Sequence, residues 1–273
     1  MSATVADIIG VMEKVAPPGL AETWDNPGLQ VGCSDWPVKK VMVALDPSLD
    51  VLENAIEESA DMLITHHPLI FRPIKSVDVG TPVGRIVDLA LRNRLSVFSA
   101  HTNLDSAADG LNDILVAHIG LENVSILDAD ETAATSSPEN ATGLGRIGDL
   151  PCRTDLASLC RRLKQALHLE SIRMIGSPEL PVSRVAVCGG SGSSLLDRFF
   201  ASGAQVFITG DIRYHDARST EEKGLALIDI GHFNSEHLVV KSLSDRLSKL
   251  LQTLNPDISV HACEVEKDPF IVL

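Results

Sequence analysis

Short apolar runs alternate with helical apolar spacing along this chain, which is typical of an α/β fold. Residues 40–45 predict a buried strand, residues 48–59 carry apolar side chains at helical spacing, and residues 62–65 predict a second strand. The same strand–helix–strand pattern returns within residues 185–209. The chain is therefore expected to contain at least two βαβ units.

The two βαβ units match each other without a gap at an offset of 144 residues (185 − 41). The matching positions are Val41, Val43, Leu52, Ala60, Ile64 and Thr65, against Val185, Val187, Leu196, Ala204, Ile208 and Thr209. This match predicts an internal duplication, with two similar α/β halves.

An acidic segment rich in Ser and Thr, without apolar periodicity, divides the expected halves. We therefore expect a first α/β half at residues 1–127, a linker loop at 128–142 and a second α/β half at 143–273. A long helix over 235–254 and a last strand over 258–263 are predicted in the second half. This C-terminal pair can pack on the first half.

The motif His-x-Asn-x-acid occurs twice, each time directly after a predicted strand. The copies are His101–Asp105 and His232–Glu236, and they are 131 residues apart (232 − 101). The predicted strand at 62–65 also ends in histidines, His66 and His67. Because sites in α/β sheets gather beyond the carboxyl ends of strands, these side chains can converge. Imidazole and carboxylate together are metal ligands, so the pattern predicts a metal site shared by the two halves.

Each motif alone has an ordinary structural explanation, as a surface or hydrogen-bonded histidine, but three strand ends with such residues favour ligation. The candidates are His66, His67, His101, Asp105, His232 and Glu236. Ligation without thiolate suits zinc, iron, manganese or nickel. Six candidates exceed one tetrahedral site, whereas two divalent ions could share a water and lower its pKa toward neutrality. The predicted chemistry is hydrolytic.

Other polar segments allow two interpretations each. The Gly-rich segment Gly189–Ser194 is either a phosphate cradle or a tight turn, and it lacks a complete nucleotide-binding fingerprint. Asp211 and His215 follow the strand that corresponds to the one before His66, so they are candidates for substrate orientation or proton transfer. Arg72 and Lys75 either meet an anionic substrate or belong to a solvated loop.

The composition narrows the function classes further. The chain has 273 residues and a net charge of −14, which disfavours general nucleic-acid binding. Aromatic residues make up only 4%, so stacking is not expected to dominate a binding surface. The five cysteines contain no Cys-x-x-Cys pair, and no apolar run approaches a membrane span. We expect a cytoplasmic protein without membrane association.

Several segments together resemble the Nif-three-like family, also called the YbgI-type dinuclear metal-centre proteins or GTP cyclohydrolase type 2 homologues. The segments are ETWDNPGLQVG (Glu22–Gly32), ITHHPLIF (Ile64–Phe71), SAHTNLD (Ser99–Asp105), GLGRIG (Gly143–Gly148), VAVCGGSG (Val185–Gly192), TGDIRYHDA (Thr209–Ala217) and GHFNSE (Gly231–Glu236). They are spread over most of the chain, and their combination is highly specific.

The resemblance implies two similar α/β domains with two metal ions between them. Its implied metal ligands are His66, His67, Asp105, His232 and Glu236. It also implies a toroidal homohexamer built as a trimer of dimers. This chain is similar to the compact bacterial form, without the large domain that some members insert between the halves. His101 then becomes an accessory or catalytic neighbour, beside the catalytic candidate His215.

The activity that the resemblance implies is the opening of the imidazole ring of guanine in GTP by a metal-bound hydroxide. Two other classes stay open. One is a metal-dependent phosphatase or related hydrolase that acts on a small anionic metabolite. The other is a non-catalytic metal-binding or protein-interaction protein. The expected ligand is a small anionic or nucleotide substrate.

Overall fold

The structure is a computed structural model that describes residues 3–129 and 142–272. Packing divides the chain into two compact units, each described by itself. Unit 1 comprises Met1–Ala107 and Val239–Lys267, and unit 2 comprises Ala108–Leu238 and Asp268–Leu273. The halves expected at residues 1–127 and 143–273 stay a prediction, since sequence repetition rather than packing defines them. Most of the expected linker, residues 130–141, lies outside the described residues.

Unit 1 contains a five-stranded sheet in the order β1-β4-β3-β2-β11, in which only β1 is antiparallel to its neighbour. The strands are β1 (Gly28–Val31), β2 (Lys40–Ala44), β3 (Met62–Thr65), β4 (Ser96–Ser99) and β11 (Ser259–Ala262). Every residue of β3 and β4 is buried, because helices cover both faces of the parallel part.

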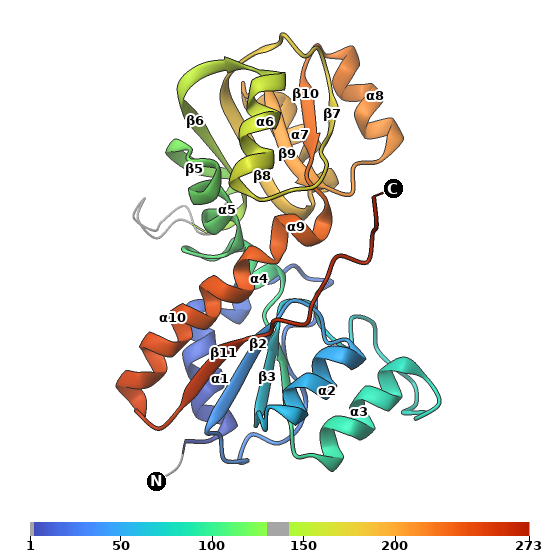
Figure 1. Cartoon of the computed structure of the whole chain (residues 1–273), viewed down its shortest axis with the longest axis vertical. Helices are drawn as coiled ribbons and strands as arrows, with labels where there is room; N and C mark the ends of the chain where they lie inside the picture. The colour runs from blue at the N-terminus through green and yellow to red at the C-terminus, as the bar shows by residue number, and fades with distance from the viewer. Residues whose placement is uncertain (1–2, 130–141, 273) are drawn as a thin grey trace. The chain divides into compact units, whose positions relative to one another are not determined.

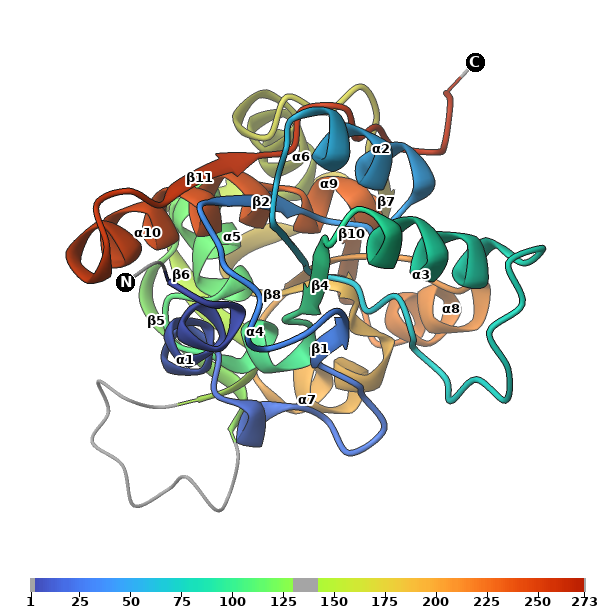
Figure 2. The same cartoon turned by 90° about the horizontal axis from the view of Figure 1, so that it is seen from below.

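The helices of unit 1 pack on both faces of its sheet. They are α1 (Val5–Val15), η1 (Pro18–Leu20), α2 (Leu49–Glu57), α3 (Pro82–Arg92), α4 (Thr102–Ser106) and most of α10 (Leu238–Leu254). Helices α2 and α3 lie on one side of the sheet and α1 on the other (Figure 1). The view from below shows the same arrangement (Figure 2). Leu52, Leu63 and Val97 belong to the core under α2 and α3.

Unit 2 contains a six-stranded mixed sheet in the order β5-β6-β8-β9-β10-β7. The strands are β5 (Glu122–Ala129), β6 (Gly143–Asp155), β7 (Arg173–Ile175), β8 (Pro181–Ser191), β9 (Val206–Gly210) and β10 (Ala226–Asp229). The helices are α5 (Leu111–Ile119), α6 (Leu156–Ala166), η4 (Gly192–Leu195), α7 (Leu196–Ala201), α8 (Tyr214–Glu222) and α9 (His232–Glu236). Alternate β8 residues enter two cores, since Val187 packs with α5 and α6 whereas Ala186 packs with α7.

The two sheets contain the same local order of strands. In unit 1 the parallel strands β2, β3 and β4 are adjacent, and antiparallel β1 pairs with β4. In unit 2 the parallel strands β8, β9 and β10 are adjacent, and antiparallel β7 pairs with β10. A five-residue helix follows the third parallel strand each time, α4 after β4 and α9 after β10. The expected α/β class is therefore confirmed in both units.

Asp105 lies inside α4, and α5 begins after it at Leu111, with Gly110 as its N-cap. The structure corrects one predicted helix boundary near the candidate ligands. Glu236 was expected in the first turn of a helix over 235–254, but it is the last residue of α9. Gly231, whose φ is +83°, precedes a separate helical turn that starts at His232, before the predicted start at residue 235. None of the described helices is long and apolar enough to cross a membrane.

Candidate metal centre

The first group of candidate ligands begins directly after β3, where the chain continues along the sheet through His66 and His67. The His66 N–H donates to the Ala44 carbonyl at 3.1 Å, and the His67 N–H donates to the Leu45 carbonyl at 2.9 Å. The two rings leave the chain with centroids 5.1 Å apart and an interplanar angle of 43°. Both imidazoles are therefore held at the carboxyl end of the strand, as the sequence predicts.

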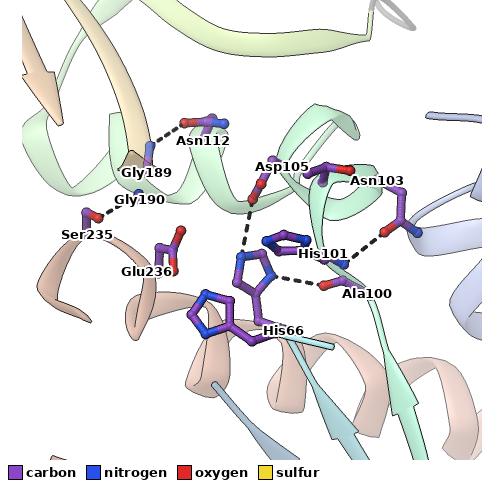
Figure 3. A network of polar contacts seen from close by, with 12 residues as sticks. His66, Ala100, His101, Asn103, Asp105, Asn112, Gly189, Gly190, Ser235 and Glu236 are labelled. Carbon is purple, nitrogen blue, oxygen red and sulfur yellow. Dashed lines mark hydrogen bonds and ion pairs between the residues drawn. The ribbon is translucent and has the colours of Figure 1, made fainter. Parts of the chain in front are cut away.

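Backbone and carboxylate oxygens orient these two rings through Nδ1. His66 is 2% exposed, and its Nδ1 lies 2.9 Å from the Ala100 carbonyl (Figure 3). His67 Nδ1 lies 2.8 Å from Asp46 Oδ1. The Nδ1 contacts leave Nε2 as the nitrogen that could ligate a metal ion. An acceptor on the other nitrogen is the usual partner of a metal-binding histidine.

Asp46 is itself fixed by the C-terminal segment of unit 1. The Asp46 N–H donates to Glu266 Oε1 at 2.8 Å, and the Leu45 N–H donates to Glu266 Oε2 at 2.8 Å. One carboxylate thus binds two successive N–H groups at the end of β2. This contact stabilises the loop that positions the carboxylate next to His67.

Asp105 and His101, from the first His-x-Asn-x-acid motif, lie with the two histidines. Asp105 Oδ1 is 3.5 Å from His66 Nε2, the contact that is drawn dashed in Figure 3. The His101 ring centroid is 5.2 Å from that of His66 and 5.6 Å from that of His67. One nitrogen from each of the three histidines can be chosen so that all lie within 4.8 Å of one another. Unit 1 thus combines three imidazoles with one carboxylate.

Asp25 holds His101 from the loop between η1 and β1. Asp25 Oδ1 is 2.8 Å from His101 Nδ1, and Asp25 Oδ2 accepts from the Thr102 N–H and hydroxyl at 3.0 and 2.5 Å. Burial alone would raise the pKa of Asp25, but the hydrogen bonds from His101 and Thr102 lower it to about 2. Asp25 is therefore ionised near neutral pH and holds a proton on His101 Nδ1.

The Asn of the first motif shapes the turn that carries His101. Asn103 Oδ1 accepts from the His101 N–H at 2.9 Å, and its amide donates to the Ala16 carbonyl at 2.8 Å. The side chain is 2% exposed. Asn103 therefore joins the motif to the end of α1, which explains why an amide suits this position.

The second group of candidate ligands consists of His232 and Glu236 on α9 in unit 2. His232 Nδ1 lies 2.8 Å from Asp211 Oδ2, and its Nε2 lies 3.0 Å from Glu236 Oε2. The Glu236 side chain is 5% exposed. Asp211, a candidate for substrate orientation, contacts His232 instead. As in unit 1, an acceptor engages Nδ1 and Nε2 is directed toward a carboxylate.

Gly190 provides the space for the Glu236 carboxylate. A Cβ on Gly190, whose φ is +58°, would lie 2.2 Å from Glu236 Oε1 and 3.4 Å from His232 Cε1. The Gly190 N–H donates to Ser235 Oγ at 2.8 Å, and the Gly189 N–H donates to Asn112 Oδ1 at 3.0 Å (Figure 3). The glycines therefore permit close packing of β8 against α9.

The hydrogen bonds of the Gly-rich segment disagree with its interpretation as a phosphate cradle. The N–H groups of Gly189 and Gly190 bind side chains, and the Gly192 N–H donates to Thr209 Oγ1 at 2.9 Å. A cradle needs these donors directed at the ligand. The segment is a packing turn that supports Glu236.

Three sequence candidates stay outside the contacts of both groups. His215 is exposed near the start of α8, and its ring centroid is 5.5 Å from that of Tyr214. Arg72 and Lys75 are exposed in the segment after β3. Their expected roles with substrate stay predictions.

The acceptors that orient the rings are not predicted by the sequence pattern. Asp25 and Asp46 lie in loops, where no periodic pattern marks them, although Asp46 directly follows a buried strand. Gly190 belongs to the segment with a candidate phosphate cradle, but it makes room for the Glu236 carboxylate instead. The signal for Asp46 was available, since the position after a parallel strand is also where the candidate ligands occur.

The donor set fits divalent transition metals. Imidazole nitrogen and carboxylate oxygen are ligands for zinc, iron, manganese and nickel, and the described site residues include no thiolate. The four histidines of the two candidate groups each have Nδ1 bound to an oxygen, which is the outer contact that such ligands need. The site thus defines an α/β protein with candidate histidine–carboxylate metal groups in both units.

The chain belongs to the Duf34/NIF3 (NGG1p interacting factor 3) family. A sequence model of this family matches residues 3–269. A Clostridium acetobutylicum protein named "GTP cyclohydrolase 1 type 2 homolog" is 34% identical over 270 residues, which cover 99% of each chain. A Streptomyces coelicolor protein of the same name is also 34% identical and covers 97% of this chain and 93% of the relative. The family prediction is therefore confirmed.

Solved structures agree with this assignment. Staphylococcus aureus hypothetical protein SA1388 matches with a TM-score of 0.91 and 28% identity, and the match covers 100% of both chains. Reduced HcgD from Methanocaldococcus jannaschii matches with a TM-score of 0.79 and 30% identity, over 96% of this chain and 98% of that one. The fold of this chain is thus the fold of NIF3-family proteins.

Proposed function

We propose that the chain is a metal-dependent hydrolase with two divalent ions, held by His66, His67, Asp105, His232 and Glu236. One observation carries the proposal: each histidine among these residues has Nδ1 bound to an oxygen acceptor. This pattern is that of imidazoles prepared to ligate through Nε2. The pattern gains its weight from the clustering of these rings with carboxylates, since the exposed His118, outside the proposed set, makes a similar Nδ1 contact with the Ile114 carbonyl at 2.8 Å.

The number of ligands supports two ions rather than one. A single tetrahedral zinc site with an open position uses three protein ligands. This chain offers five ligands in the proposed set, with His101 beside them. Zinc, iron, manganese and nickel all suit these donors, so the donor set does not select among them.

Hydrolysis is the chemistry that this set supports best. Divalent ions would supply Lewis acidity and lower the pKa of a bound water toward neutrality. Among the chain's own residues, the Asp25–His101 pair is suited to proton transfer. Asp25 keeps a proton on His101 Nδ1 and stabilises the imidazolium that forms when Nε2 takes a second proton. His101 is therefore proposed as a catalytic residue, whereas His215 stays a catalytic candidate from the sequence alone.

The names of the relatives suggest the reaction. Both Clostridium acetobutylicum and Streptomyces coelicolor proteins are called GTP cyclohydrolase 1 type 2 homologs. We propose ring opening of GTP, or of a related small anionic substrate, as the reaction. A metal-dependent phosphatase is the first alternative. A non-catalytic interaction protein is the second, since the family description names an interacting factor.

We further propose that the two units arose by duplication and that the chain assembles as a cytoplasmic homohexamer. The shared order of three parallel strands, each set followed by a five-residue helix with the His-x-Asn-x-acid motif, supports the duplication. The hexamer and the cytoplasmic location rest on the family resemblance and the composition.

The test combines metal quantification with turnover. The purified protein should bind about two divalent ions per chain and consume GTP, followed by absorbance and by mass of the product. Asp105→Asn and Glu236→Gln should each lower metal content and abolish turnover. Asp245→Asn is the matched control, since this exposed acid pairs with Lys241 on the surface of α10.

The possible results separate the three functions. Two ions without GTP loss would contradict the cyclohydrolase reaction, and a screen of phosphate esters would then test the phosphatase. A protein partner that still binds Asp105→Ala and Glu236→Ala would favour the interaction protein. A chain without bound divalent ions would overturn the whole proposal.

A further inference from the structure

Two large aromatic side chains stand exposed beside the histidines of unit 1. Trp24 is 56% exposed and Phe71 is 45% exposed, in a chain with only two Trp and seven Phe. Their ring centroids are 5.7 Å apart in an edge-to-face arrangement with an interplanar angle of 64°. Exposure of both rings costs hydration free energy, so a bound ligand would explain it.

Both rings also contact His101. The His101 centroid is 6.1 Å from that of Trp24 and 6.4 Å from that of Phe71. His101 in turn lies among the rings of His66 and His67. The aromatic pair is therefore within the length of one small molecule from the proposed metal ligands.

Hydrogen bonds fix the two segments that carry the aromatic rings. The Asn26 amide donates to the Ile70 carbonyl at 2.6 Å, and the Ile70 N–H donates to Gln30 Oε1 at 3.1 Å. Asp25, which lies between Trp24 and Asn26, binds Thr102 and His101. Since the positions of both segments are set before any ligand arrives, binding does not need to order them.

We propose that Trp24 and Phe71 bind the planar heteroaromatic ring of the substrate next to the metal ligands. Indole and phenyl faces stack on nitrogen heterocycles with little dependence on the exact ring, and this contact suits the base of a purine nucleotide. This proposal rests on the proposed function and names its substrate class. The expectation from composition, that stacking does not dominate a binding surface, stays a prediction, and this proposal requires only two well-placed aromatic residues.

Binding by calorimetry tests the proposal with three probes: guanosine 5′-monophosphate, guanosine and ribose 5-phosphate. The metal-loaded wild-type protein should bind the monophosphate more tightly than ribose 5-phosphate, by roughly 5- to 150-fold, the range for one stacked base. Trp24→Ala and Phe71→Ala should each remove most of this preference and leave ribose 5-phosphate binding unchanged. Guanosine should lose affinity in both variants, which shows that the ring is the group contacted.

Two controls separate the aromatic pair from general damage. Phe270→Ala removes another exposed ring, 79% exposed, and should change nothing. Metal content should stay at the wild-type level in Trp24→Ala and Phe71→Ala, since neither ring is a ligand.

A fluorescence measurement reports on Trp24 directly. In Trp36→Phe, Trp24 is the remaining tryptophan of the chain, and its fluorescence should be quenched by guanosine 5′-monophosphate but not by ribose 5-phosphate.

Three results would overturn the proposal. Equal binding of the monophosphate and ribose 5-phosphate would show that the ring is not recognised. Unchanged monophosphate binding by Trp24→Ala and Phe71→Ala would place the ring elsewhere. Dissociation of the protein into smaller species by Trp24→Ala, without an effect on ligand affinity, would identify the pair as an interface between copies. None of these results is read from GTP turnover, so failure of turnover is recorded separately.

Discussion

The two copies of the His-x-Asn-x-acid motif occupy equivalent positions in their sheets and make different contacts. In unit 2, His232 and Glu236 of the same motif lie together, with Nε2 to Oε2 at 3.0 Å. In unit 1, Asp105 lies 3.5 Å from His66, and His101 is held by Asp25. The second copy therefore pairs its own histidine with its own acid, whereas the first copy divides its histidine and its acid between two partners.

The two histidines also differ in their surroundings. The His101 side chain is 15% exposed and its partner Asp25 is fully buried, whereas the His232 and Asp211 side chains are 34% and 51% exposed. A buried carboxylate holds an imidazole more strongly than an exposed one, because water competes less for its hydrogen bonds. The same motif can therefore supply a metal ligand in one unit and a fixed proton-transfer group in the other.

The largest expected effect is the loss of metal from either copy when its acid is neutralised. Glu236→Gln and Asp105→Asn keep side-chain size but remove the charge that a divalent ion needs. Each should lower metal affinity by more than about 100-fold, beyond the 10–100-fold typical of outer contacts. Competition with a chelator of known affinity measures this. Metal loss in only one of the two variants would show that the two copies of the motif do not bind the metal ions together.

A pair of positioning variants should separate the roles of the two histidines. Asp25→Asn removes the ionised acceptor of His101, so GTP turnover should fall by about 100-fold while bound metal stays unchanged. Asp211→Asn replaces the ionised acceptor of His232 by a neutral amide, so metal affinity should fall by about tenfold. Turnover of the fully metal-loaded Asp211→Asn protein should recover. Metal loss in Asp25→Asn would make His101 a ligand and the two copies alike.

Gly190→Ala should disturb the second copy alone. The new Cβ would meet Glu236 Oε1 at 2.2 Å and displace the carboxylate, so metal affinity should fall by about 10- to 100-fold. Gly203→Ala is the matched control, since its φ of +77° imposes similar strain but no atom lies within 4 Å of the new Cβ. Equal effects of the two substitutions would show that backbone strain, not the carboxylate, matters.

Glu266→Gln should have the smallest effect. It weakens the hydrogen bonds from Leu45 and Asp46 by removing the charge of the acceptor, which should lower the free energy of unfolding by about 1 kcal/mol. Metal affinity should fall less than in Asp211→Asn, because Asp46 still reaches His67. Urea denaturation of the metal-free protein measures the stability. No change in stability would mean that Glu266 does not hold this loop.

The sequence predicted the parallel strands and the residues at their ends, because buried strands are continuous apolar runs and ligands follow them. It also predicted the family, from motifs spread along the chain, and the profile match confirms that prediction. It could not show which acceptor binds each imidazole. Asp25 and His101 are 76 residues apart, and Glu266 and Leu45 are 221 apart, so only folding brings them together.

Helix boundaries were the least predictable feature near the site. The pattern around Glu236 continues smoothly from α9 into α10, yet the chain breaks the helix between them. The position of Trp24 was equally hard to predict, because an exposed aromatic residue in a loop belongs to no periodic pattern. Its hydrogen-bonded neighbours give the ring its place beside His101.

The most direct test of the account is anomalous X-ray diffraction from crystals of the protein loaded with zinc or manganese. We expect two peaks per chain, ligated by Nε2 of His66, His67 and His232 and by the carboxylates of Asp105 and Glu236. Nδ1 of each histidine should keep its oxygen acceptor. Peaks absent from these side chains, or ligation through Nδ1, would contradict the account.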